Sequence, residues 1–397
     1  MDLTAWLLGR TPVRPLVATT VGGTGARLAV EQEIRRRGWR PALNPAEANL
    51  LIVPGPADPA MAPFTNAVWQ LIPAPRVRLD LVDASEVASA LSSAERRLRS
   101  PEEQRSAATE DTVALNAEHH HTPAIEAHHA APGSHDDQQH SHHSGHGDTE
   151  HSRHEGHGSQ DEHADGSHSG QMAHGHHHGH DMSGMEMPGG IPMADRADDR
   201  DGLKLDRLTV PLGPVLPAWP AGLLVHAVLQ GDVVQEAVVE TVLTPAHGTA
   251  AFWDSLASDR IRIAARRLDS CARLLTVAGW EHAAVTAARL RDNLLSEQEP
   301  GPRFARWAKL VRRSRVLRWS LTGVGIHADS GDALDRLTRW IDEAEAAIDG
   351  TASAVDEDPA AVLDALPGLL AGAEFATARL IVASFDPDLE RVRVTHG

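Results

Sequence analysis

The sequence predicts an α/β fold followed by an α+β fold: a small parallel α/β domain, a disordered histidine-rich linker, and a β-hairpin sheet leading into a helical bundle. Short apolar runs and amphipathic helical stretches alternate near the start, a pattern typical of a parallel sheet covered by helices. Apolar residues then almost vanish between residues 127 and 171 and return at regular spacing beyond that stretch. The predicted parts are residues 1–100, 101–200, 201–250 and 251–397.

Three strands alternate with three helices in the first part. Residues 15–21 form a β-branched run that ends at a glycine-rich turn, and residues 26–37 follow with helical periodicity. In this helix Leu28 and Ile34 lie on one side, and charged residues including Glu31 and Arg35 lie on the other. Gly38 should end it, because glycine is favoured just after a helix. The further elements are strands at 48–53 and 77–82 and helices at 64–72 and 85–98.

The glycine-rich turn, residues 22–25, has two interpretations. Between a strand and a helix it could hold a phosphate at the helix N-terminus, which would suit a nucleotide-dependent redox enzyme. However, the spacing is not G-x-G-x-x-G and no Walker lysine follows. The alternative, which we favour, is a tight turn that starts the helix.

The last part contains a hairpin and then helices. Two β-rich runs, residues 223–229 and 233–242, flank Gly231-Asp232, a hairpin pattern. Residues 252–296 are helical, and their apolar stripe contains Cys271, which we interpret as a small core residue rather than a nucleophile. Near the C-terminus, Pro367-Gly368 should kink or break a helix that starts at Pro359.

Residues 303–318 are strongly basic, with Trp307 and Trp319 nearby. One interpretation is docking onto an acidic partner or an anionic membrane surface. The other is a solvated helix face that pairs with the acidic helix 332–349. The sequence leaves the two open.

Composition excludes several classes of protein. The formal charge of −18 argues against a nucleic-acid partner, although the 25 histidines outnumber that charge and could make the chain basic at low pH. One cysteine rules out an internal disulfide and an Fe–S cluster held by this chain alone. No apolar run approaches the ~20 residues of a membrane span, and the first residues do not resemble a signal peptide. We expect a cytoplasmic protein with no direct membrane span, held on the inner face of the membrane through partners if at all.

The histidine-rich stretch is the predicted metal site. Between residues 119 and 180 lie 20 of the 25 histidines, and three methionines follow closely. Imidazole binds Zn, Ni, Co and Cu, and thioethers add affinity for Cu(I). Several exchangeable sites are expected; the alternative is a linker that binds metal only incidentally. The predicted ligands are His119, His120, His121, His142, His143, His146, His174, His176, His177, His178, His180, Met182, Met185 and Met187.

The first part resembles the small electron-transfer subunit of respiratory complex I and of NiFe-hydrogenases. The resemblance lies in the order strand, glycine-rich loop, helix, and then ANLLIVPG at residues 48–55, where that family has a strand of the type ADLMIVAGT. The family's first loop carries cysteines that bind a 4Fe–4S cluster. Here that loop, residues 22–26, has no cysteine. The resemblance therefore implies a relative that has lost its cluster.

The last part resembles the quinone-site large subunit of complex I, which is homologous to the hydrogenase large subunit. That family opens with G-P-x-H-P, then H-G, then a hairpin with a "dGE.V" turn. Gly213-Pro214 begins the corresponding run here, but Leu216 stands at the first histidine and Ala221-Gly222 replaces His-Gly. The next motif, H-R-G-x-E-K, is absent, with residues 246–249 at best a remnant, and so are the nickel-binding cysteine pairs. The resemblance implies the scaffold without its chemistry.

Together these resemblances imply a non-catalytic subunit of an assembly related to NADH-quinone oxidoreductases, lacking Fe–S, nickel and quinone ligands. Its partners would be membrane-embedded complex-I-like subunits, and its histidine-rich segment would bind a transition metal. We find no catalytic set of side chains in the sequence, so the chain would be a pseudoenzyme. The alternative function is a stand-alone metallochaperone or metal-storage protein for Ni, Zn, Co or Cu.

Overall fold

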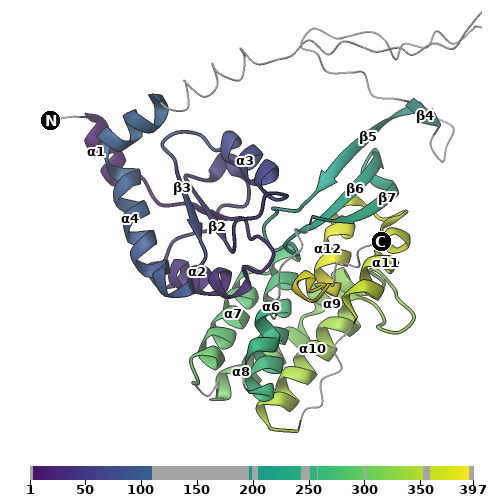
Figure 1. Ribbon diagram of the computed structural model, residues 1–397. Helices are drawn as coiled ribbons and strands as arrows, with labels where there is room; N and C mark the ends of the chain where they lie inside the picture. The colour runs from purple at the N-terminus through teal and green to yellow at the C-terminus, as the bar shows by residue number, and fades with distance from the viewer. Residues whose placement is uncertain are drawn as a thin grey trace, which may run out of the picture. The chain divides into compact units, whose positions relative to one another are not determined.

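The computed structural model describes residues 3–109, 196–198, 204–242, 251–256, 258–298, 301–351 and 358–392 (Figure 1). All of these residues belong to one compact unit. The histidine-rich stretch and its proposed metal ligands lie outside the described residues.

A three-stranded parallel sheet forms the centre of the N-terminal part, in the order β1-β2-β3. The middle strand, β2, is buried along its whole length, which explains its unbroken apolar sequence. The mixed α/β character predicted for this part is confirmed, although β1 is shorter than the predicted strand. The strands are β1 (Pro15–Val17), β2 (Leu50–Pro54) and β3 (Val77–Leu81).

Helices and short 3-10 turns connect these strands. Gly38 has a φ of 68° and ends α2, as its position predicted. The N-terminal α1 was not predicted, and residues 101–109 are also helical. The elements are α1 (Leu3–Arg10), α2 (Thr24–Arg37), η1 (Pro45–Glu47), α3 (Ala62–Leu71), η2 (Ala84–Glu86) and α4 (Val87–Arg99).

A second sheet of four antiparallel strands follows, in the order β4-β5-β6-β7. The predicted hairpin is β6 and β7, and Gly231 in its turn has a φ of 64°, which glycine adopts without strain. The strands are β4 (Arg196–Asp198), β5 (Lys204–Leu212), β6 (Leu223–Gln230) and β7 (Val233–Thr241).

The remainder is helical. The stretch predicted as helical over residues 252–296 is divided into η3, α6 and α7, with Gly279 at a φ of 76° between the two helices. Of the predicted kink or break at Pro367, the break is wrong: α11 continues to Leu370, because a proline near the helix end removes one hydrogen bond where few remain. The elements are η3 (Phe252–Ser255), α6 (Asp259–Val277), α7 (Glu281–Leu295), α8 (Gly301–Arg313), α9 (Arg315–Leu321), α10 (Ala333–Ile348), α11 (Pro359–Leu370), α12 (Phe375–Phe385) and η4 (Leu389–Arg391).

Buried apolar side chains form separate clusters between these elements. One apolar cluster joins α6, α7, α8 and α10, and another places α11 and α12 against β6. Cys271 is fully buried in the first cluster, as predicted, and burial raises the pKa of its thiol far above the ordinary value. Within the described ranges, every helix is too short or too polar to cross a membrane.

Candidate functional site

One face of α2 carries charged residues that are directed into the protein. Arg27, Glu31 and Arg35 are spaced four residues apart, so their side chains lie on the same side of the helix. They meet Asp269 on α6 and the Arg291-Asp292 pair on α7. We name these six residues the α2 cluster.

The contacts in the α2 cluster are short and mutual. The Arg27 guanidinium donates to Asp269 at 2.6 Å, and Arg291 donates to the other oxygen of Asp269 at 2.5 Å. Arg291 also reaches Glu31 at 3.0 Å, and Arg35 reaches Asp292 at 2.6 Å. Three cations therefore face three carboxylates, and their charges balance.

Burial makes these pairs interdependent. The Arg291 side chain is only 1% exposed and that of Asp269 is 4% exposed. Burial by itself raises a carboxyl pKa, but the charges of Arg27 and Arg291 outweigh it and lower the pKa of Glu31 to about 2. The same two arginines hold the pKa of Asp269 well below its ordinary range. Both carboxylates are thus ionised at neutral pH.

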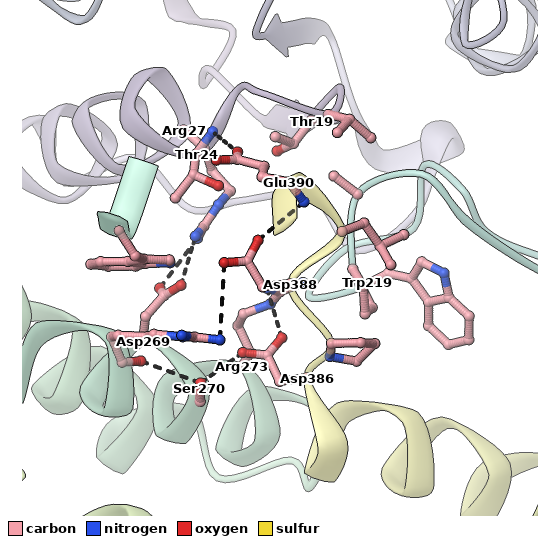
Figure 2. A pocket seen from close by; sticks show the side chains of 17 residues that line it. Thr19, Thr24, Arg27, Trp219, Asp269, Ser270, Arg273, Asp386, Asp388 and Glu390 are labelled. Carbon is pink, nitrogen blue, oxygen red and sulfur yellow. Dashed lines mark hydrogen bonds and ion pairs between the residues drawn. The ribbon is translucent and has the colours of Figure 1, made fainter. Parts of the chain in front are cut away.

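A cavity of about 40 Å³ lies beside Arg27 and Asp269. Its walls include Thr19 and Thr24 from the glycine-turn region and Trp219 from the loop before β6. Figure 2 shows Arg27, which also lines the cavity, in contact with Asp269. The two loops that carry the family resemblances therefore line one cavity.

The chain's own carboxylate occupies the N-terminus of α2. Glu390 accepts hydrogen bonds from the backbone N–H of Thr24 at 3.1 Å and from that of Phe252 at 2.9 Å. A helix N-terminus attracts anions, and this is where a phosphate would bind under the nucleotide interpretation of the glycine turn. Glu390 fills that role from the C-terminal end of the described chain.

Close packing explains why positions 23, 25 and 55 are glycine. A Cβ at Gly23 would come within 2.3 Å of the Pro54 carbonyl oxygen, and one at Gly55 within 2.2 Å of the Thr20 hydroxyl. Gly25 packs against Phe252, where a Cβ would come to 3.0 Å. The geometry favours the tight-turn interpretation over a phosphate loop.

Replacing Gly23 with Ala is expected to destabilise the protein by about 1–3 kcal/mol, because the added methyl group has no room against backbone atoms. Denaturant unfolding measures this change. Gly9→Ala is the matched control, since nothing lies within 4 Å of a Cβ at that helical position. Equal stability of the two variants would contradict the packing role.

Two further ion pairs line the cavity from residues 386–390. Arg273 contacts Asp386 at 2.7 Å (Figure 2), and Arg266 lies 3.9 Å from the Asp388 carboxylate. Asp388 Oδ1 accepts from the Glu390 N–H, whereas its buried Oδ2 has no hydrogen-bond partner. Burial raises the pKa of Asp388 to about 6.

Asp388→Asn is expected to stabilise the protein at neutral pH by up to about 3 kcal/mol, because it removes a buried charge and keeps an oxygen for the turn. A carboxyl with a raised pKa costs stability above about pH 6, and this cost fades as pH falls toward 3.8. The difference between variant and parent should therefore be largest near pH 7 and vanish near pH 4. Unfolding curves across this range test it; a constant difference would contradict the assignment.

The residues of this site do not suit a 4Fe–4S cluster of the kind that the small-subunit family binds. Neither cysteine nor histidine is among the residues that line the cavity, and Cys271, the single cysteine of the chain, is buried in the helical core. In the part of the chain that the structure describes, no group of three or more His, Cys, Asp or Glu residues could hold a metal ion. The proposed ligands from His119 to Met187 lie outside that part.

Sequence reasoning missed the α2 cluster. Glu31 and Arg35 were placed on the polar side of their helix, which is correct, but that side packs on α6 and α7 instead of facing water. The four-residue spacing of Arg27, Glu31 and Arg35 is the one feature of the sequence that points to this cluster. It fits an exposed helix equally well, so it could not identify the contact.

No protein-family model matches the chain, and no curated protein matches its sequence. Among solved structures, the chain is similar to one from the membrane-bound sulfane sulfur reductase, described as an archaeal respiratory membrane complex. The alignment covers 47% of this chain and 99% of that chain, with 12% identity and a TM-score of 0.36. The protein thus has a distant structural neighbour in a respiratory membrane complex.

Proposed function

We propose that the chain is a non-catalytic subunit of a complex-I-like, hydrogenase-like membrane assembly, and that its histidine-rich segment binds a transition metal. The observation that carries the first part is the cavity beside the α2 cluster. Loops from the small-subunit-like and large-subunit-like parts meet there, at Thr24 and Trp219. In place of cysteines or histidines, the cavity has paired arginines and carboxylates.

The chemistry of this cavity suits a scaffold. An Fe–S cluster needs thiolates, and a phosphate at the start of α2 would compete with Glu390 for the Thr24 N–H. Apart from Asp388 Oδ2, the charged groups described around this cavity are paired, and this leaves little charge to bind a polar substrate. At about 40 Å³, the cavity is also too small for more than a few waters.

Affinity purification of the tagged chain from its native cells in mild detergent tests the subunit proposal. Mass spectrometry should identify membrane-embedded subunits that resemble proton pumps. A matched chain with residues 119–180 replaced by a Gly/Ser linker should recover the same partners. A chain that purifies alone, or with a soluble metalloenzyme and bound metal, would contradict the proposal and favour the metallochaperone, the alternative that the 20 clustered histidines support.

Replacing the histidines between residues 119 and 180 with Ser is expected to abolish binding of Zn, Ni, Co and Cu, because they are the only dense set of imidazoles in the sequence. Equilibrium dialysis measures the binding. Changing His226, His282 and His327 to Ser is the control and should leave it unaltered. Metal binding that survives the first change would contradict the assignment, whereas circular dichroism should stay the same for both variants.

A further inference from the structure

The helices α8 and α9 carry an unusual concentration of positive charge. Residues 301–321 contain seven arginines and lysines and no acidic residue, in a chain whose formal charge is −18. One of the seven, Arg312, pairs with Asp342 at 2.5 Å and Glu345 at 2.8 Å on α10. The other six make no ion pair with a carboxylate of the described residues. They are Arg303, Arg306, Lys309, Arg313, Arg315 and Arg318, all exposed.

Large apolar side chains are exposed among these cations. On α9, Trp319 is 85% exposed and Val316 is 73% exposed, and Leu310 on α8 is 47% exposed. The opposite face of α9, with Leu317 and Leu321, is buried in the helical core. The exposed Trp and Val are therefore additional to what the fold needs.

The spacing on α9 arranges these groups across one face. At about 100° per residue, Arg315, Val316, Arg318 and Trp319 span less than half of the helix circumference. Trp319 lies between the two arginines and Val316 on this face. A helix face with cations along one edge and apolar side chains along the other suits a helix that lies in the headgroup region of a bilayer.

We propose that the exposed face of α9, together with the cations of α8, binds an anionic lipid surface. Lipid phosphates would neutralise the arginines, while Trp319 and Val316 enter the boundary with the acyl chains. An acidic protein would neutralise the cations equally well but would need an apolar pocket for Trp319. A bilayer has anionic headgroups directly beside an apolar phase, just as this face has cations directly beside apolar side chains. This surface does not depend on the partner subunits proposed above.

Cosedimentation of the purified full chain with vesicles tests this proposal. Vesicles of phosphatidylcholine with about one third phosphatidylglycerol should bind the chain, pure phosphatidylcholine should bind it weakly, and high salt should release it. A buffer at about pH 7.5 with EDTA keeps the histidines of residues 119–180 uncharged and free of metal. Two pairs of substitutions then separate charge from apolar contact.

Arg315→Glu with Arg318→Glu should weaken binding about 25-fold or more, since each cation near an anionic surface is worth about fivefold. Trp319→Ser with Val316→Ser should weaken it at least about tenfold. The matched controls are Arg96→Glu with Arg105→Glu, and Leu71→Ser with Val82→Ser, which change equally exposed residues elsewhere and should retain binding within about twofold.

The proposal would be overturned if the chain showed no preference for anionic vesicles, or if the substituted variants bound vesicles as well as the parent does. Retention on immobilised polyglutamate without vesicle binding would also overturn it and would assign the surface to an acidic protein. Circular dichroism and thermal unfolding establish that each variant is folded. Because no partner subunit takes part, vesicle binding can hold even if the purification finds no membrane complex, and it can fail even if that purification succeeds.

Discussion

Replacing Arg291 with Met is expected to lower the free energy of unfolding by about 3–5 kcal/mol, because it removes one partner of a buried ion pair. Arg291 is 1% exposed and contacts Glu31, Asp269 and Asp292. Methionine fills much of the same volume but leaves three carboxylates with two cations. The cost comes from uncompensated buried charge, because the apolar stem of the side chain is largely retained.

Guanidinium unfolding followed by tryptophan fluorescence measures this effect. Arg306→Met is the matched control, since that exposed arginine makes one hydrogen bond to a backbone carbonyl, and its change should stay within about 0.5 kcal/mol. A loss below about 1 kcal/mol for Arg291→Met would mean that the α2 cluster contributes little to holding α2 against α6 and α7.

Acidification from about pH 4.5 to pH 2 is expected to remove much of the stability that Glu31 and Asp269 supply. Both carboxyls have a lower pKa in the folded chain than in the unfolded one, with that of Glu31 at about 2. Their contribution is therefore complete above the ordinary carboxyl pKa and is lost as pH falls through the folded value. Equilibrium unfolding at successive pH values should show this steep loss.

Asp269→Asn should already be about 3–5 kcal/mol less stable than the parent at pH 7 and should lose less on acidification. Glu102→Gln changes an exposed carboxyl and should keep the slope of the parent. If the parent and Asp269→Asn had the same slope between pH 4.5 and pH 2, the coupling of this carboxylate to Arg27 and Arg291 would be wrong.

The sequence predicted the elements whose determinants are local. Gly38 ends α2, Gly231-Asp232 turns the hairpin, and the apolar run of β2 is buried, each for a reason visible within a few residues. The division between α6 and α7 escaped prediction because an isolated glycine, Gly279, is tolerated within a helix as well as after one. The eight residues of α1 are too few to show a clear period.

The candidate site could not be predicted in the same way, because its determinants are far apart in the chain. Arg27 meets Asp269 at a sequence separation of 242 residues, and Thr24 meets Glu390 at a separation of 366. A charged helical face has the same local pattern whether it faces water or a complementary face. Which of the two occurs depends on how both parts of the chain fold. In this protein the polar face of α2 is buried against α6 and α7.

Cleavage of the intact chain between its two parts tests whether the α2 cluster holds them together. A specific protease site inserted between residues 119 and 180 would allow the folded chain to be cut, and size-exclusion chromatography would follow the fragments. Joined by the α2 cluster, the two fragments should elute together, and Arg27→Glu, which opposes like charge to Asp269, should separate them. If the fragments of the unaltered chain eluted separately, the α2 cluster would not hold the two parts together.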